Sequence, residues 1–183
     1  MRHLADPEHV SHEVIEPTPR SSPIRSTSYP RPVPSTFTLE TRTQHAADHL
    51  FDVSLSIDAH LGSMSGSGER AVGGVTSGQI GLGEQVTWRA RHFGIWFTMT
   101  SRIEELERPH RFVDSQVSGP FRSFVHEHTF QDLGGSTVMV DTITLAAPAG
   151  GRPAEVLVLV PYIRHLVRAR NDYLLTVLDS GAH

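Results

Sequence analysis

Residues 124–145 read FVHEHTFQDLGGSTVMVDTITL, two segments of alternating apolar and polar residues on either side of a glycine pair. Gly134 and Gly135 suit a two-residue hairpin loop, because such loops need positive φ angles that glycine adopts without strain. The antiparallel register that follows from this loop places His128 opposite Asp141. The stretch therefore predicts a β-hairpin that brings an imidazole and a carboxylate side by side on one face.

A third strand is expected to extend this polar face. A turn near Gly119 and Pro120 would bring residues 111–117 alongside residues 122–131. The two-residue period of a strand then gathers polar and large apolar side chains on one face, namely Asp114, Gln116, His126, His128 and Asp141 with Phe112, Phe124, Phe130 and Met139. Buried polar groups without partners cost about 1–3 kcal/mol each, so these groups must bond to each other, to water or to a bound molecule. Both a polar network that only fixes strand register and a small-molecule site fit this pattern.

The rest of the chain supplies further strands and three helices. Alternation predicts strands at residues 37–42, 85–92, 95–105, 111–117, 122–131 and 137–145, and apolar spacing predicts helices at residues 46–53, 58–64 and 161–178. Arg164, Arg168 and Arg170 are expected on the solvated face of the last helix. This order of elements predicts an α+β domain in which a curled antiparallel sheet packs against the long terminal helix.

The composition favours one compact domain preceded by a tail. The chain has 183 residues, 38% of them hydrophobic, and 7 of its 12 prolines fall within residues 1–36. We expect residues 1–36 to be a disordered Pro/Ser-rich tail and residues 37–179 to be the folded domain. The chain contains no cysteine, which excludes disulfides, thiolate nucleophiles and zinc sites built on thiolates.

Charge and hydropathy limit the partners that we expect. The net charge of -4 gives no electrostatic reason for binding to nucleic acid. The longest aliphatic run, residues 156–160, is too short to span a bilayer, and the first residues do not resemble a secretory signal. The sequence therefore favours a cytoplasmic bacterial protein, monomeric or homodimeric, without stable membrane insertion.

Two motifs raise the question of a cofactor. His126 and His128 form an H-x-H pair on one strand face, and Asp141 or Asp114 could complete a metal site. No third histidine lies on that face of the meander, so we expect no metal. The glycine-rich residues 73–78 lack the Lys-Ser/Thr of a phosphate loop and precede a strand rather than a helix, so we expect no nucleotide or other cofactor.

Three segments together resemble a known superfamily. They are residues 112–121 (FVDSQVSGPF), 126–130 (HEHTF) and 134–141 (GGSTVMVD), with Arg170 and Asn171 following in the terminal helix. The combination resembles the SRPBCC, or START-like, superfamily and within it the polyketide cyclase/dehydrase-type bacterial branch, over residues 37–179. The resemblance implies a helix-grip fold, in which a curved seven-stranded antiparallel sheet wraps around a long C-terminal helix. It further implies two short helices after the first strand and a deep hydrophobic cavity.

The chain departs from this pattern at two places. Phe124 and Val125 stand where many relatives carry a Trp just before the H-x-H motif. Residues 145–148 lack the Tyr of the Tyr-x-x-Pro sequence that many relatives carry after the last strand. Both changes would reshape the cavity, so the resemblance does not select one activity from the superfamily.

Three hypotheses of function remain. The chain binds a small hydrophobic organic molecule (polyketide-, aromatic- or lipid-like). Alternatively, it is a lyase- or isomerase-like cyclase or dehydratase without a metal or nucleotide cofactor, in which His126 or His128 moves a proton and Asp141 orients it. The third hypothesis is a stress-response or chaperone-cofactor-like protein that acts through its surface. The expected ligand contacts are Leu50, Trp88, Phe97, Met99, Phe112, Asp114, Gln116, Phe124, His126, His128, Phe130, Met139, Asp141 and Ile143.

Overall fold

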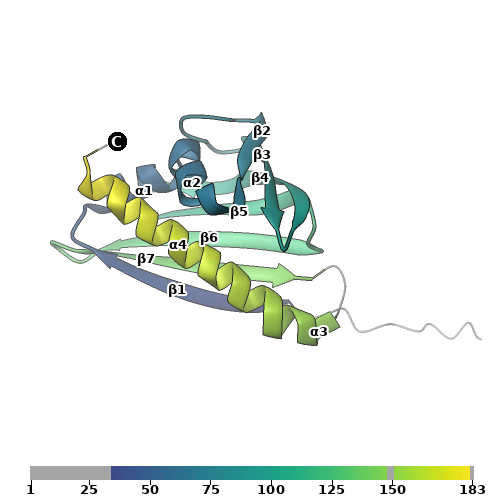
Figure 1. The fold of residues 1–183 in the computed structure, drawn as a ribbon. Helices are drawn as coiled ribbons and strands as arrows, with labels where there is room; N and C mark the ends of the chain where they lie inside the picture. The colour runs from purple at the N-terminus through teal and green to yellow at the C-terminus, as the bar shows by residue number, and fades with distance from the viewer. Residues whose placement is uncertain (1–33, 148–150, 182–183) are drawn as a thin grey trace, which may run out of the picture. The chain divides into compact units, whose positions relative to one another are not determined.

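The computed structural model describes residues 34–147 and 151–181 (Figure 1). The tail predicted from the sequence therefore lies outside the described residues up to residue 33. The first strand begins at Ser35, two residues before the start that alternation predicts.

Seven strands form one antiparallel sheet in the spatial order β1-β7-β6-β5-β4-β3-β2. They are β1 (Ser35–Thr43), β2 (Arg70–Gly74), β3 (Gln85–His92), β4 (Ile95–Glu107), β5 (Arg111–Ser118), β6 (Ser123–Asp132) and β7 (Thr137–Ala146). Two short helices, α1 (Ala47–Ser54) and α2 (Ile57–Ser63), and a 3₁₀ turn (Ser65–Ser67) connect β1 to β2. With the long terminal helix, this arrangement confirms the predicted α+β helix-grip fold.

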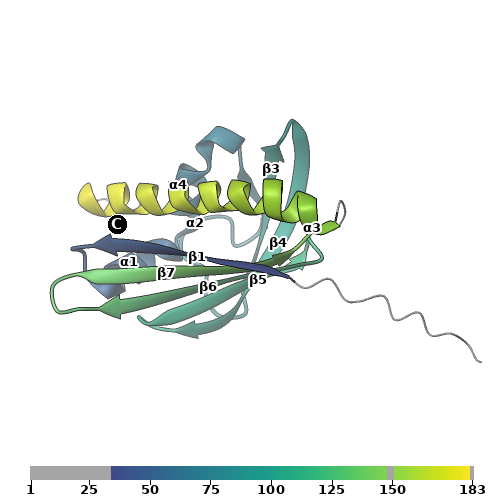
Figure 2. The ribbon, with the colours of Figure 1, turned by 90° about the horizontal axis from the view of Figure 1, so that it is seen from below.

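One continuous helical segment follows β7 and lies across the sheet (Figures 1 and 2). It comprises α3 (Gly151–Ala154), a π-helical turn (Glu155–Leu159) and α4 (Val160–Asp179). The buried carboxylate of Glu155 accepts hydrogen bonds from Ser35 Oγ at 2.5 Å and from the Ala147 amide at 2.6 Å. The start of the helical segment is therefore bonded to the first residue of β1 and to the residue after β7. Among the described helices, none has the length and apolarity needed to cross a bilayer.

The register predicted from the glycine pair is confirmed. His128 lies opposite Asp141, and Asp114 of β5 lies opposite His126. The loop has the expected backbone, because Gly134 and Gly135 adopt φ angles of 75° and 127°. These pairings place the polar candidates from three adjacent strands on one face.

β2 is the strand that alternation does not predict, although the resemblance implies seven strands. Its sequence explains why alternation misses it. It is short and ends in Gly73 and Gly74, so it shows little of the alternation that marks a strand. The register also shifts between Ala71 and Gly73, which breaks the two-residue period. At Gly74 the φ angle is 70°, and a Cβ there would lie 2.0 Å from the carbonyl oxygen of Gln85. These glycines therefore allow a close approach of two backbones and the turn that follows.

The buried side chains form two apolar clusters. The larger one lies where α1 and α2 cover the sheet, and Phe51 of α1 is fully buried in it. The Phe51 ring meets Phe112 and Phe130 edge-on, with centroids 5.5 Å and 5.2 Å away. The smaller cluster joins β1, β6 and β7 to Val167 of α4. The two short helices thus close one end of the space between sheet and helix.

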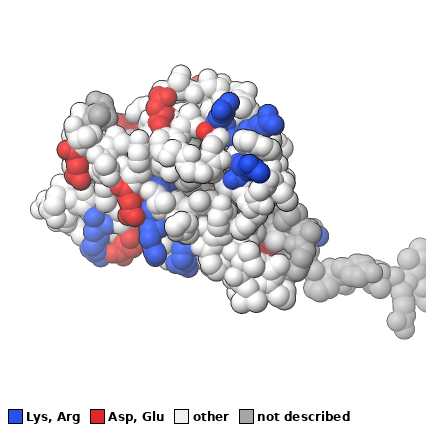
Figure 3. Space-filling model, in the orientation of Figure 1, with Lys and Arg blue, Asp and Glu red and all other residues white. Residues whose placement is uncertain are grey.

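The surface carries charges of both signs. On the face shown in Figure 3, acidic and basic side chains are scattered over a largely uncharged surface. Charged side chains also pair along the strands, as Arg111 of β5 does with Glu105 and Glu127. Solvent-exposed pairs of this kind contribute little to stability, and they leave the fold dependent on its apolar clusters.

We expect Phe51→Ala to lower the free energy of unfolding by about 3–5 kcal/mol, because it leaves a void among aromatic rings that cannot collapse fully. Urea denaturation followed by circular dichroism measures this. The matched variant Leu82→Ala removes a side chain that is 62% exposed and should change the value by less than about 0.5 kcal/mol. Equal losses in the two variants would contradict the assignment of Phe51 to the core.

Candidate functional site

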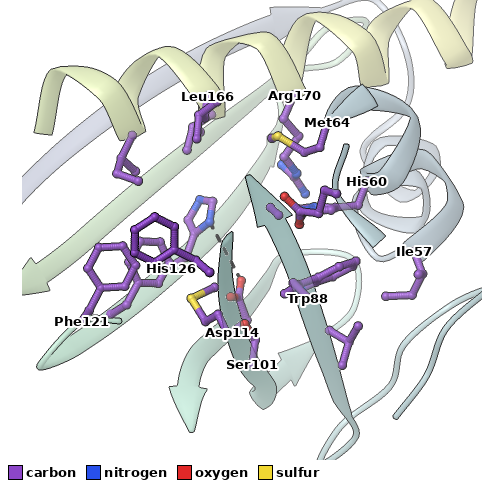
Figure 4. Close-up of a pocket in the computed structure, with 18 of the residues that line it drawn as sticks. Ile57, His60, Met64, Trp88, Ser101, Asp114, Phe121, His126, Leu166 and Arg170 are labelled. Atoms are coloured by element: carbon purple, nitrogen blue, oxygen red, sulfur yellow. Dashed lines mark hydrogen bonds and ion pairs between the residues drawn. The ribbon is translucent and has the colours of Figure 1, made fainter. Parts of the chain in front are cut away.

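A cavity of about 400 Å³ lies between the sheet and α4. The inward-facing residues of β3 (Val86, Trp88 and Ala90) form part of its wall, as the alternation of that strand dictates. Figure 4 shows Trp88 and His60 on the side of α2, and Leu166 and Arg170 reaching in from α4. Most of the wall is apolar, and its polar groups form two sets, one of them around the buried carboxylate of Asp141.

The structure brings eight of the fourteen predicted ligand contacts to the cavity wall. They are Trp88, Phe97, Met99, Phe112, Asp114, Phe124, His126 and His128. Leu50, Phe130 and Met139 instead pack in the larger cluster, and Ile143 packs in the smaller one. The Gln116 amide bonds to both backbone groups of Phe121 and so fixes the turn after β5.

Asp141 lies behind the cavity wall at the centre of a polar network. Its carboxylate is fully buried and accepts a hydrogen bond from His126 Nε2 at 2.9 Å and another from Asn171 Nδ2 at 2.6 Å. His128 Nδ1 lies 2.8 Å from the same carboxylate, at an angle too bent for a hydrogen bond. Burial alone would raise the pKa of Asp141, but its contacts with His126 and His128 outweigh this and hold the pKa well below the usual value. Asp141 is therefore an anion that orients both imidazoles.

Asp114 faces the same two imidazoles from the cavity side. Its Oδ2 atom lies 3.3 Å from His128 Nε2 and 4.0 Å from His126 Nδ1. Burial raises the pKa of Asp114, but the hydrogen bond with His128 and the charges of His126 and Arg170 bring the pKa below the usual value. Burial lowers the pKa of His126, and His128 lowers it further, while the two carboxylates offset only part of the effect. Each imidazole thus lies between two carboxylates.

Arg170 is a member of this network that the sequence analysis misses. The prediction of a solvated face is wrong for this residue, because Arg170 is only 6% exposed and lines the cavity. It donates to Asn171 Oδ1 at 3.1 Å and to the Ser54 carbonyl oxygen at 3.0 Å, with Nη1 3.8 Å from Asp141. Burial lowers the pKa of Arg170 and the two aspartates oppose this shift, so the guanidinium remains charged. The sequence does indicate that Arg170 is buried, because this residue falls three residues after Val167 and four before Leu174, on the apolar stripe of α4.

A second group of polar side chains lines the cavity farther along β3. His60 stacks on Trp88 with centroids 4.3 Å apart, and its Nε2 lies 3.0 Å from Glu69. His92 Nδ1 lies 2.8 Å from the Tyr162 hydroxyl. Burial, with the charge of Glu69, raises the pKa of Tyr162, which therefore stays a neutral phenol. These four side chains bond in two pairs and are separate from the network around Asp141.

The network predicts a loss of stability in acid. Because the pKa of His126 in the folded chain lies below the ordinary histidine value of 6.5, the unfolded chain takes up more protons as the pH falls from about 7 to about 5. The free energy of unfolding should fall over that interval by up to about 1.4 kcal/mol per pH unit. A second fall should begin near the ordinary aspartate pKa of 3.8, as the unfolded chain protonates Asp141.

Urea denaturation at a series of pH values measures this, and His126→Gln should flatten the dependence between about pH 7 and about pH 5. The matched variant His165→Gln, on an exposed position of α4, should keep it. Identical pH profiles for the wild type and His126→Gln would contradict the assignment.

Comparison with known proteins finds similarity at the level of fold. No family model matches the chain, and no curated protein matches its sequence. The solved structure of the Zhui aromatase/cyclase from a Streptomyces species is similar with a TM-score of 0.65 and 16% identity, over 82% of this chain and 96% of that one. A START superfamily protein from Mycobacterium smegmatis is similar with a TM-score of 0.61 and 11% identity, over 78% and 98% of the two chains. A major latex-like protein from Panax ginseng is similar with a TM-score of 0.54 and 13% identity, over 78% of this chain and 99% of that one. The chain therefore has the START-like helix-grip fold.

Proposed function

We propose that the protein binds a small, largely apolar organic molecule in the cavity between the sheet and α4. The observation that supports this is a cavity of about 400 Å³ with apolar walls and a few convergent polar groups. Small-molecule sites combine these two features, because apolar walls supply affinity and a few polar groups fix orientation. We infer that the oxygen-bearing end of the ligand lies against Asp114, His126 and Arg170.

The volume favours a compact ligand. It lies toward the small end of the range of about 300–1,000 Å³ that small-molecule pockets occupy. An aromatic or folded polyketide-like molecule suits such a space better than a lipid with two long chains. Burial of about 200 Å² of apolar ligand surface would contribute about 5 kcal/mol before the costs of association.

An enzymatic function in the same cavity is the second candidate, and one contact favours it. Because Asp141 accepts the proton of His126 Nε2, a neutral His126 carries its lone pair on Nδ1. That nitrogen faces Asp114 at the cavity wall, where it could take a proton from a bound ketone. The similarity to an aromatase/cyclase fold is consistent with cyclase or dehydratase chemistry of this kind. The hypothesis of a protein that acts through its surface would be favoured by the absence of an internal cavity. The structure has such a cavity, so this observation does not favour that hypothesis.

Filling the cavity tests the binding proposal. Ala90→Phe places a ring in the wall of the cavity, and we expect it to weaken the binding of 1-naphthol, followed by fluorescence, by about tenfold or more. The matched variant Arg91→Phe adds the same ring on the exposed face of β3 and should leave the affinity unchanged. Thermal unfolding checks that both variants are folded. Equal affinity in the two variants, or no binding by the wild type, would count against a ligand cavity.

A turnover assay separates the second candidate from the first. With a synthetic linear poly-β-ketone thioester as substrate, an acid–base role predicts that His126→Gln lowers the rate of cyclised product by about 10²–10⁴-fold. The His165→Gln variant, outside the cavity, should keep the rate. No product from the wild type, together with retained 1-naphthol binding, would leave binding alone as the function.

A further inference from the structure

We propose that Asp114, His126 and His128 form a binding site for a divalent first-row transition-metal ion in the cavity wall. Each residue offers one ligand atom, and the three atoms lie within 4.8 Å of one another. No third histidine lies on this face, but the carboxylate of Asp114 supplies the third donor from the neighbouring strand. Two imidazoles and one carboxylate are the donor set of catalytic zinc sites and of non-haem iron sites.

The distances are close to those of an assembled site. Metal–ligand bonds of about 2.0–2.1 Å place neighbouring ligand atoms about 3.3 Å apart in a tetrahedral site. The Asp114 Oδ2 and His128 Nε2 atoms are 3.3 Å apart, and Asp114 Oδ2 and His126 Nδ1 are 4.0 Å apart. Closing the second distance requires a movement of about 0.7 Å. Asp114 can supply it, because its side chain is 21% exposed and turned toward the cavity (Figure 4).

Asp141 and Asn171 lie behind the two imidazoles and hold the rings with one nitrogen turned toward the proposed ion. Histidines that bind a metal through one ring nitrogen commonly direct the other toward a carboxylate, which fixes the tautomer. Here Asp141 Oδ1 accepts a hydrogen bond from His126 Nε2 at 2.9 Å and lies 2.8 Å from His128 Nδ1, without the geometry of a hydrogen bond to this second ring. Asn171 Nδ2, 2.6 Å from the other oxygen of Asp141, holds that carboxylate in place. Both remaining ring nitrogens are thereby turned toward Asp114.

The local charge also leaves room for a cation. The carboxylates of Asp114 and Asp141 and the guanidinium of Arg170 sum to one negative charge when both imidazoles are neutral. A divalent ion changes this sum to one positive charge, which a single anionic oxygen would neutralise. An open coordination position toward the cavity would therefore favour an enolate, phenolate or carboxylate oxygen as the ligand group. Without a metal, His128 Nε2 and Asp114 Oδ2 lie 3.3 Å apart, and an ion would take the place of the hydrogen bond between them.

Titration with Co²⁺ tests the site without any organic ligand. Metal-free protein without an affinity tag should bind one Co²⁺ per chain with a Kd below about 10 μM, seen in visible absorption, and Zn²⁺ should displace it. Asp114→Asn and His128→Gln should each weaken binding by about 100-fold or more. The matched variant His60→Gln changes another cavity histidine, whose partner is Glu69, and should bind Co²⁺ as the wild type does.

Three results would overturn the proposal. One is a Kd above about 1 mM for the wild type, and another is equal binding by the wild type and the two site variants. A loss of binding when His3, His9 and His12 are replaced would also overturn it, by placing the ion on the N-terminal residues. If the site variants do not fold, NMR of the wild type decides. Diamagnetic Zn²⁺ must then shift the ring protons of His126 and His128 and leave those of His60 in place.

The metal site and the proposed organic ligand are independent. The 1-naphthol titration requires no metal, and the Co²⁺ titration requires no organic molecule, so either can fail while the other succeeds. Success of both would identify a cavity that takes both a metal ion and an organic molecule.

Discussion

The structure depends on one buried anion. The Asp141 carboxylate is fully enclosed, and removing it from water is costly unless its oxygens receive donors on every side. Those donors come from β6 and α4, and β1 joins the network through Thr41, which accepts a bond from Asn171. The same carboxylate therefore fixes the pairing of the last hairpin, the rotation of the terminal helix about its axis and the orientation of two imidazoles. The same contacts therefore stabilise the fold and position the polar groups at the cavity wall.

The layering of the domain separates a packed part from a hollow part. At the end covered by α1 and α2, Phe51 fills the space between sheet and helix with aromatic contacts. Beyond it, the cavity lies between the sheet and the side chains of α4. The polar network lies at the boundary between the two parts. Its position gives it rigid support on one side and opens it to the cavity on the other.

Much of this was predictable from the sequence, for reasons that are local. The glycine pair sets the hairpin register, and the two-residue period then fixes which side chains share a face, so the pairing of His128 with Asp141 follows directly. Which helix covers each part of that face depends on contacts between residues far apart in the sequence. The period of a strand cannot show that α1 fills the space over Phe130 and Met139 while leaving His126 open to the cavity. The prediction for Arg170 fails for another reason, because its charge favours solvent while its position on the apolar stripe of α4 buries it.

The place of β1 in the sheet has a consequence for how the protein forms. As the first strand of the domain, β1 pairs only with β7, the last one, so that Phe37 meets Ile143 and Thr41 meets Met139. The bond between Ser35 and Glu155 closes a loop of 120 residues. Contacts between such distant segments form late and slowly, because the entropy of loop closure must be lost before they stabilise the chain. During synthesis the first strand can pair only after the last hairpin has left the ribosome, and the cavity forms only when folding is complete.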